Sequence, residues 1–378
     1  MRHPLRMRTL AAAVVLALVA TTGAGITGAA SAPDRAAVRD DAIGWLAPQV
    51  TDEGALISAY TGAPDPSLTA QAVLGLAGSG ADPATVARMM QYLESHIADF
   101  VAPGGSADSA GALGWLILDA VATDNDPTDF GGVDLVSRLE ATQRPDGLFG
   151  SGDPTYDGAF RQALSLTALA AVGHTNADGV AWLLAQQCAD GGFVAYRPDT
   201  TVPCPSVDPA NFAGEDTNST ALSAIALHLS GEAAASDAAM TWLEGVRTAG
   251  GGFAYLGDAG LQQDANSTGM VALAFRTVRG ADDAGAVTAL ASLQVPQSGD
   301  PLDRGGIAFQ DGDPLFPDLM ATTQAILGLA GQGLPFTPVP PQETTTTTTS
   351  IPTIPAPSAP GAMAPAASPL TATPTYTG

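Results

Sequence analysis

Six aspartates stand at the same point of a repeated pattern, each just before a run of small or apolar residues. A carboxylate there could bind a cation or a hydroxylated ligand, or could serve as one member of an acid–base pair. It could equally accept hydrogen bonds from the first N–H groups of a helix, as an N-cap does. Both interpretations stay open at this point. The six candidates are Asp65, Asp108, Asp157, Asp216, Asp264 and Asp318.

Three further residues could contribute to a site. Trp115 falls inside an apolar run, so it is a candidate to line a cavity, with core packing as the alternative. Cys188 and Cys204 are the two cysteines, and in an exported chain such a pair predicts a disulfide worth about 3 kcal/mol. A shared metal is the alternative for the pair, but the few histidines lack metal-ligand spacing. We therefore expect no metal site and no cofactor.

The pattern that carries the aspartates is a unit of about 43 to 60 residues, which is typical of helical-repeat proteins. In its clearest copy a first helix at 182–187 ends in the turn Asp190-Gly191-Gly192-Phe193, and a second helix begins at 216–221. Glycines after an apolar run permit the left-handed turn that ends a helix. The Asp, Asn, Ser and Thr cluster before the next run supplies N-caps. Six such copies predict six helical hairpins.

The two helices of each unit differ in polarity. Second helices, such as 221–227 and 325–330, are small or apolar nearly all round, so they should be buried, whereas the first helices are mixed and should lie outside. No distinctly polar repeat caps either end, as an open solenoid would need. We therefore predict an all-α fold, an α/α toroid or (α/α)6 barrel of about six helical hairpins.

The two ends of the chain differ in composition from the repeats that lie between them. Residues 1–32 carry arginines, a short apolar core and a closing Ala-x-Ala, which predicts a secretory signal peptide. A Thr/Pro/Ala-rich tail at 337–378 should be disordered and resembles a glycosylated or wall-spanning stalk. The toroid domain is thus expected at 33–336. The protein should be secreted, with the tail as a possible link to the cell wall.

The charge limits the partners of this chain. All 14 basic residues are arginines, and the formal net charge is −24. A field of this sign repels phosphate backbones and anionic membranes, so nucleic acid is excluded as a partner. No other stretch approaches the roughly 20 apolar residues of a membrane span, so none is expected in the mature chain. The remaining partner classes are an unknown small molecule or a cell-surface partner.

The repeat resembles that of the terpenoid cyclase and protein prenyltransferase superfamily, whose toroids carry prenyltransferase and squalene oxidase repeats. The resemblance lies in Gln187-Cys188-Ala189-Asp190-Gly191-Gly192-Phe193 followed by Arg197-Pro198, and it extends over about residues 40 to 332. It implies the toroid fold. It does not by itself imply catalysis, because the matching motif is a structural turn.

The residues that carry chemistry in that superfamily are missing here. Cyclases of the squalene–hopene type use the middle acid of an Asp-x-Asp-Asp motif, where this chain reads Asp216-Thr217-Asn218-Ser219. The prenyltransferase zinc ligands, an Asp-x-Cys pair and a later His, are also absent from the sequence. The sequence thus favours a secreted, non-catalytic binding protein with no assigned catalytic residue. The alternative is an enzyme, either a divergent terpene-cyclase relative or a carbohydrate-active (α/α)6 enzyme.

Overall fold

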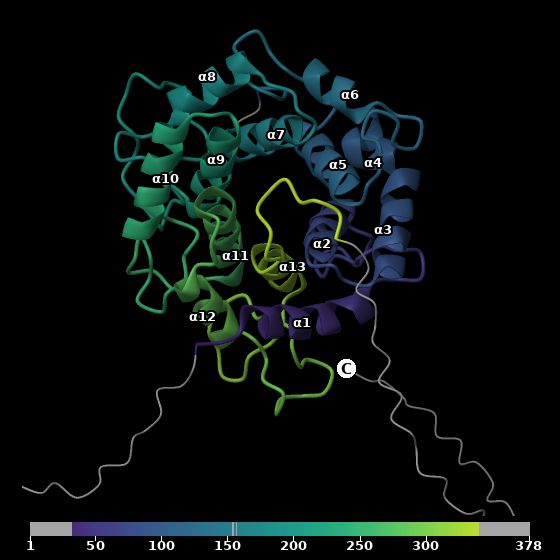
Figure 1. Cartoon of the computed structure of the whole chain (residues 1–378). Helices are drawn as coiled ribbons and strands as arrows, with labels where there is room; N and C mark the ends of the chain where they lie inside the picture. The colour runs from purple at the N-terminus through teal and green to yellow at the C-terminus, as the bar shows by residue number, and fades with distance from the viewer. Residues whose placement is uncertain (1–31, 153–154, 156, 340–378) are drawn as a thin grey trace, which may run out of the picture. The chain divides into compact units, whose positions relative to one another are not determined.

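Two concentric rings of helices make up the structure, a computed structural model that describes residues 32–152, 155 and 157–339 (Figure 1). The inner ring consists of α2 (Pro66–Gly78), α5 (Ala110–Ala122), α7 (Ala159–Ala171), α9 (Thr217–Leu229), α11 (Ala265–Ala274) and α13 (Leu319–Gly328). The outer ring consists of α1 (Arg35–Leu46), α3 (Pro83–Ser95), α6 (Leu135–Ala141), α8 (Ala177–Gln186), α10 (Ala233–Gly245) and α12 (Ala284–Ser292). Shorter helical pieces are α4 (Ile97–Val101), η1 (Ala47–Gln49), η2 (Pro103–Gly105) and η3 (Phe275–Arg279).

The inner ring is closed. Each inner helix contacts the next one along the chain, and α13 packs back against α2. The first outer helix covers this seam, because α1 packs on α13 and α12. Arg35 pairs with Asp282 at 3.0 Å, and the Gln294 side chain donates to the Val38 carbonyl at 2.8 Å. The predicted all-α toroid of six hairpins, with an apolar inner layer, is therefore confirmed.

Five of the six turns between an outer and an inner helix lie against the following outer helix. Gly191 has a φ of +105°, and a Cβ there would lie 2.4 Å from the carbonyl oxygen of Ala238 in α10. A side chain on the inner helix holds the same turn from inside, since the Thr220 hydroxyl accepts the Phe193 N–H at 2.9 Å. Equivalent acceptors for the turns of other repeats are Thr69, Gln162, Thr268 and Thr322.

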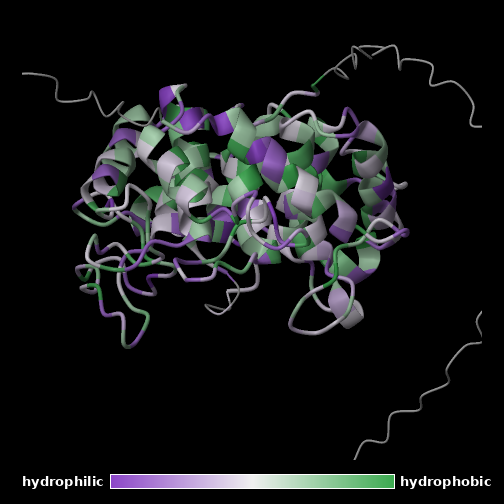
Figure 2. Ribbon diagram, turned by 90° about the horizontal axis from the view of Figure 1, so that it is seen from below, coloured by the Kyte–Doolittle hydropathy of each residue, from purple (hydrophilic) through white to green (hydrophobic). Residues whose placement is uncertain are grey.

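The two ends of the barrel differ. All inner helices start at the same end, where the long outer-to-inner connections gather, and we call this end the mouth (Figure 2). At the opposite end, residues 331–337 cross the centre of the ring after α13 (Figure 1). Phe336 is 1% exposed there, and Gln332 donates to the Gly78 carbonyl at 3.0 Å. We call residues 331–337 the plug.

The predicted signal peptide and most of the predicted tail lie outside the described residues. The first helix begins at Arg35, just after the predicted boundary at residue 32. Among the helices that the structure describes, none has the length and apolar character needed to cross a membrane.

Candidate functional site at the toroid mouth

Four of the six predicted aspartates are N-caps. The carboxylates of Asp65, Asp216, Asp264 and Asp318 each accept a backbone N–H from the residue three positions later, at 2.7–3.0 Å. Each begins an inner helix, where the orphan N–H groups and the helix dipole favour a negative charge. These four side chains therefore have a structural role that accounts for their position.

The other two aspartates do not share that position, so the expected sixfold equivalence is wrong for them. The caps of α5 and α7 are Ser109 and Gly158, each one residue after the predicted aspartate. A one-residue shift takes Asp108 and Asp157 off the helix N-terminus. Both carboxylates instead line one cavity.

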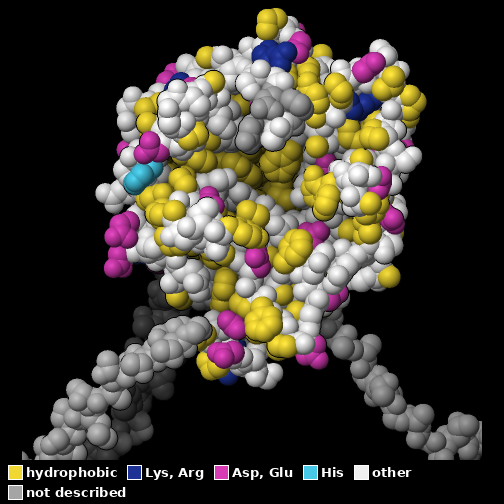
Figure 3. All heavy atoms as spheres, turned by 180° about the vertical axis from the view of Figure 1, so that it is seen from behind, with side chains coloured by type: hydrophobic (Ala, Val, Ile, Leu, Met, Phe, Trp, Pro, Cys, Tyr) yellow, Lys and Arg dark blue, Asp and Glu magenta, His cyan; other side chains and the backbone are white. Residues whose placement is uncertain are grey.

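This cavity opens at the mouth and has a volume of 710 Å³. Seen from the mouth, the surface is hollowed and its floor is largely apolar (Figure 3). The wall is formed by the first turns of α2, α5 and α7, by one side chain of α13, and by the connections that precede α5 and α7. The polar groups of the wall are Ser67, Gln71, Ser106, Asp108, Ser109, Ser151, Asp157, Arg161 and Gln324, and its aromatic groups are Phe100, Trp115 and Phe160.

Neighbouring side chains and backbone hold both carboxylates in place. Arg138 of α6 binds Asp108 through two hydrogen bonds, Nε to Oδ2 at 2.7 Å and Nη2 to Oδ1 at 2.5 Å. This contact raises the pKa of Arg138 above its ordinary value. Asp157 accepts the Ser151 hydroxyl at 3.2 Å and the Gly152 N–H. Such fixed acceptors can bind the hydroxyl or amine donors of a ligand.

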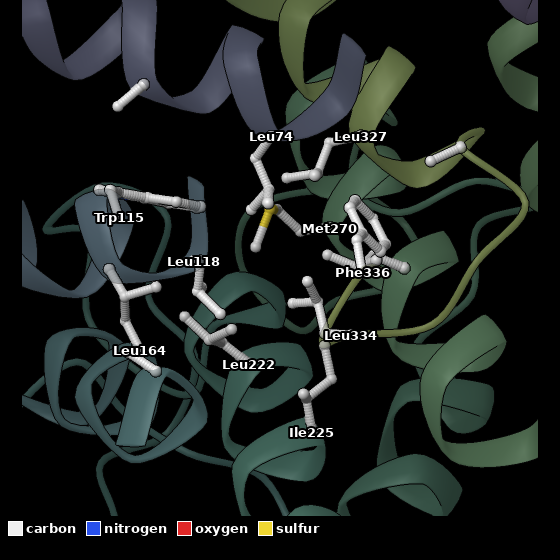
Figure 4. Close-up of a cluster of buried hydrophobic side chains, with 14 of the residues drawn as sticks. Leu74, Trp115, Leu118, Leu164, Leu222, Ile225, Met270, Leu327, Leu334 and Phe336 are labelled. Atoms are coloured by element: carbon white, nitrogen blue, oxygen red, sulfur yellow. The ribbon is translucent and has the colours of Figure 1, made fainter. Parts of the chain in front are cut away.

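The inner wall follows the repeat. The residue six positions after each N-cap is Gln71, Trp115, Leu164, Leu222, Met270 or Gln324. Four of these line the cavity. Gln324 donates to Gln71 across the seam at 2.8 Å. Figure 4 shows Trp115 and Leu164 on one side of the apolar cluster, with Leu222 and Met270 nearer its middle. Trp115 is only 6% exposed, so it both packs in the core and lines the cavity.

The opposite side of the mouth, at α9 and α11, contains buried acids and unpaired acceptors. Asp216 is 2% exposed, and burial raises its pKa from 3.8 to about 6 against the opposing effect of its hydrogen bonds to Ser219. Burial likewise raises the pKa of Asp264 and of Glu215. Among the described residues, Asp216 Oδ2, Asn218 Oδ1 and Asn266 Oδ1 are buried without a hydrogen-bond partner.

The predicted disulfide between Cys188 and Cys204 is present, with the two Cα atoms 5.8 Å apart. It commits both thiols, although the Glu215 carboxylate lies within 4.8 Å of the sulfurs. Arg197 supports the same loop, donating to the carbonyls of Gln187 at 3.1 Å and Val202 at 2.7 Å. The loop before α9 is thus held at several points.

The comparisons with known proteins support this class of fold. No protein-family model matches the chain, and no curated protein matches it. A solved protein from Actinoplanes is 16% identical, with a TM-score of 0.55 over 79% of this chain and 99% of that one. An inactive variant of an α-1,6-mannanase of Salegentibacter, in complex with α-1,6-mannotriose, is 14% identical, with a TM-score of 0.54 over 80% and 100% of the two chains. The type II terpene cyclase MstE from Scytonema is 16% identical, with a TM-score of 0.52 over 78% and 97%.

At these identities the likeness shows the fold alone. The chain is an α/α toroid, a scaffold that enzymes of unrelated chemistry share. What this toroid does must therefore be argued from its own mouth.

Sequence reasoning missed several residues of the cavity. Arg138 lies on an outer helix 30 positions from Asp108, and no local pattern links the two. Phe160 and Arg161 are the second and third residues of α7, after its cap Gly158. One signal in the sequence was available. Asp108 is followed directly by Ser109 and Asp157 directly by Gly158, and these residues take the cap position in place of the aspartates.

Proposed function

We propose that this chain is an exported toroid of the cyclase and prenyltransferase repeat type, and that it binds a small hydroxylated molecule at its mouth without converting it. In this proposal residues 1–32 are a signal peptide, 33–336 form the toroid and 337–378 are a tail. One observation carries the binding role. The two aspartates released from helix capping converge on a single cavity that also contains Trp115 and Phe160.

The chemistry of the wall favours a neutral polyol over an ion or a hydrocarbon. Carboxylate, amide and hydroxyl groups offer many acceptors and some donors, while aromatic faces cover the apolar side of a ligand. Asp108 already has a cationic partner in Arg138. A purely apolar ligand would leave these polar groups without partners, which costs free energy.

The test is native mass spectrometry of the mature protein purified from its own culture medium, followed by denaturation to identify any bound molecule. Ser67→Trp should fill the cavity from the first turn of α2 and abolish binding. Thr241→Trp, on the exposed face of α10, is the matched control and should retain the ligand. Retention of the same molecule by Ser67→Trp would contradict the assignment of the cavity.

An enzyme of the carbohydrate-active class is the second candidate, because two carboxylates share the cavity. Asp157→Asn separates the two functions. A hydrolase should lose about 100-fold or more of its turnover, since acid–base catalysis contributes that much. A binding protein should yield no product with or without the substitution, and Asp157→Asn should weaken the retention of its ligand instead. If the unmodified protein forms product and Asp157→Asn does not, the chain is an enzyme and the binding proposal is wrong.

A further inference from the structure

The large apolar side chains that the toroid exposes are concentrated at one end. Among the described residues, all of those that are at least 39% exposed lie on the outer-to-inner connections or in the first turn of α13. Five of them are aromatic. They therefore surround the same mouth that contains the cavity, and clustered exposed apolar groups mark interaction sites.

Two of these aromatic residues occupy equivalent positions over the inner helices. Tyr255 and Phe309 each follow a turn by two residues, and their carbonyls accept the N–H of the first residue of α9 at 2.8 Å and of α11 at 2.9 Å. Their side chains are 39% and 46% exposed. The equivalent residue over α7, on the cavity side, is Ala195. We call Tyr255 and Phe309 the platform.

Unpaired acceptors lie next to the platform. Asn218 and Asn266 stand two positions after the caps of α9 and α11. Their counterparts in α2, α5 and α7 are Ser67, Gly111 and Phe160, which line the cavity. The repeat therefore directs both asparagines toward the interior of the mouth. Both side chains are partly exposed, but their amide oxygens are buried and receive no donor. A turn of the amide group would bring the oxygen to a ligand hydroxyl and recover the free energy that a buried acceptor without a donor costs.

The charge at this face limits which ligand fits. Asp216 and Asp264 lie beneath the platform. Burial raises the pKa of Tyr255 to about 12, and the negative charge of Asp216 adds to this rise. The whole chain carries a net charge of −24. An anionic polymer would be repelled. Flat exposed rings beside hydroxyl-seeking acceptors instead suit the apolar faces and edge hydroxyls of neutral sugars.

We propose that the mouth binds a neutral polysaccharide chain, with one sugar in the cavity and following sugars stacked on Tyr255 and Phe309. Asn218 and Asn266 accept hydrogen bonds from the hydroxyls of these sugars. The inference rests on the proposed function, because the cavity holds the first unit. It adds the class of ligand and a second binding region on the other side of the mouth.

Affinity electrophoresis through mannan, dextran or a soluble β-glucan tests the platform, with heparin as the anionic arm. The Tyr255→Ala/Phe309→Ala double variant should bind the preferred neutral polymer about tenfold more weakly, the sum of two stacking contacts. The Tyr255→Phe/Phe309→Tyr double variant keeps both rings and should stay within about twofold of the parent. Equal retention of the alanine variant, preference for heparin, or no retention by any neutral polymer would overturn the inference.

The corresponding monosaccharides separate the platform from the cavity, because the proposal places a single sugar in the cavity. Binding of the monosaccharide, measured by calorimetry, should be lost in Ser67→Trp and kept in the platform double variant. If Ser67→Trp leaves monosaccharide binding intact while the platform variant loses the polymer, the cavity assignment fails and the platform stands. If Ser67→Trp loses both ligands and the platform variant loses neither, the platform fails and the proposed function stands.

Discussion

Aspartates near one point of a repeat can have different roles, and their position relative to the helix cap decides which. Asp216 accepts the Ser219 N–H at 2.7 Å and is only 2% exposed. Desolvation disfavours its charged form, which is why its pKa is raised. Asp108, one residue before its helix cap, binds Arg138 at the edge of the cavity instead. The same residue type thus serves the fold in one repeat and the site in another.

The pKa of Asp216 predicts how stability depends on pH. Because the pKa of its folded state, about 6, exceeds the ordinary 3.8, the folded protein holds this proton more tightly than the unfolded chain. Its stabilising effect is complete below about pH 4 and is lost as the pH rises through 6. Asp216→Asn keeps an N-cap without the charge. It should raise the free energy of unfolding at pH 7.5 by up to about 3 kcal/mol and change it little at pH 4.

Urea unfolding at both pH values measures this effect. Asp318→Asn is the control, because it alters an equivalent cap but leaves Asp216 in place, so the parent's slope should persist. If the free energy of unfolding depends on pH in the same way in the parent and in Asp216→Asn, the pKa of Asp216 does not differ between the folded and unfolded states.

At the scale of the helix and its turn, one inner-helix side chain accepts a backbone N–H of the preceding turn in five of the six hairpins. The Thr220 hydroxyl in α9 accepts the buried N–H of Phe193 at 2.9 Å. Thr220→Val keeps the shape but leaves that N–H without a partner, so it should lower the free energy of unfolding by about 1–3 kcal/mol. Thr167→Val in α7 is a matched control, since the Thr167 hydroxyl is buried without a partner and its loss should be neutral or stabilising.

Chemical denaturation of both variants measures the difference. Equal losses from Thr220→Val and Thr167→Val would mean that the hydrogen bond to the turn contributes nothing beyond packing. The Phe193 amide should also exchange with solvent faster in Thr220→Val alone, since only that variant frees it.

These local ties explain how much of the fold could be predicted. Glycine at a left-handed turn, a cap and an apolar helix act within a few residues, so their spacing predicted the hairpins and the two layers. The cap shift at Ser109 and Gly158 depends on backbone conformation, and an aspartate stood nearby in either case. The partners Arg138 and Gln324 come from distant segments, which a local pattern cannot specify. Trp115 was predicted because its apolar run was clear.

At the scale of the whole molecule, the toroid is a ring with one open and one closed end. Leu334 and Phe336 of the plug enter the apolar centre beside Met270 and Leu327 (Figure 4). The Thr277 hydroxyl accepts the Leu334 N–H at 3.0 Å. Residues 331–336 were expected within the toroid domain, and only Thr337 was expected in the tail, whose boundary was set by its Thr/Pro/Ala-rich composition. The side chains of Leu334 and Phe336 are both buried, so the plug fills the centre of the ring at the end opposite the mouth.

The fit of the plug predicts a specific coupling between two residues. A Cβ on Gly78, at the end of α2, would lie 2.3 Å from the Phe336 ring. Gly78→Ala should therefore destabilise the parent, and Phe336→Ala should cost about 3–5 kcal/mol because it empties a buried site. In the double variant the alanine at position 78 meets no ring, so the two losses should fall short of their sum by about 1 kcal/mol or more. Gly44→Ala in α1, with open space around it, should instead stabilise the helix by about 0.5–1 kcal/mol and add independently to Phe336→Ala. Strict additivity of the Gly78 and Phe336 substitutions would mean that the ring does not occupy this place in solution, and the far end of the barrel would then be open.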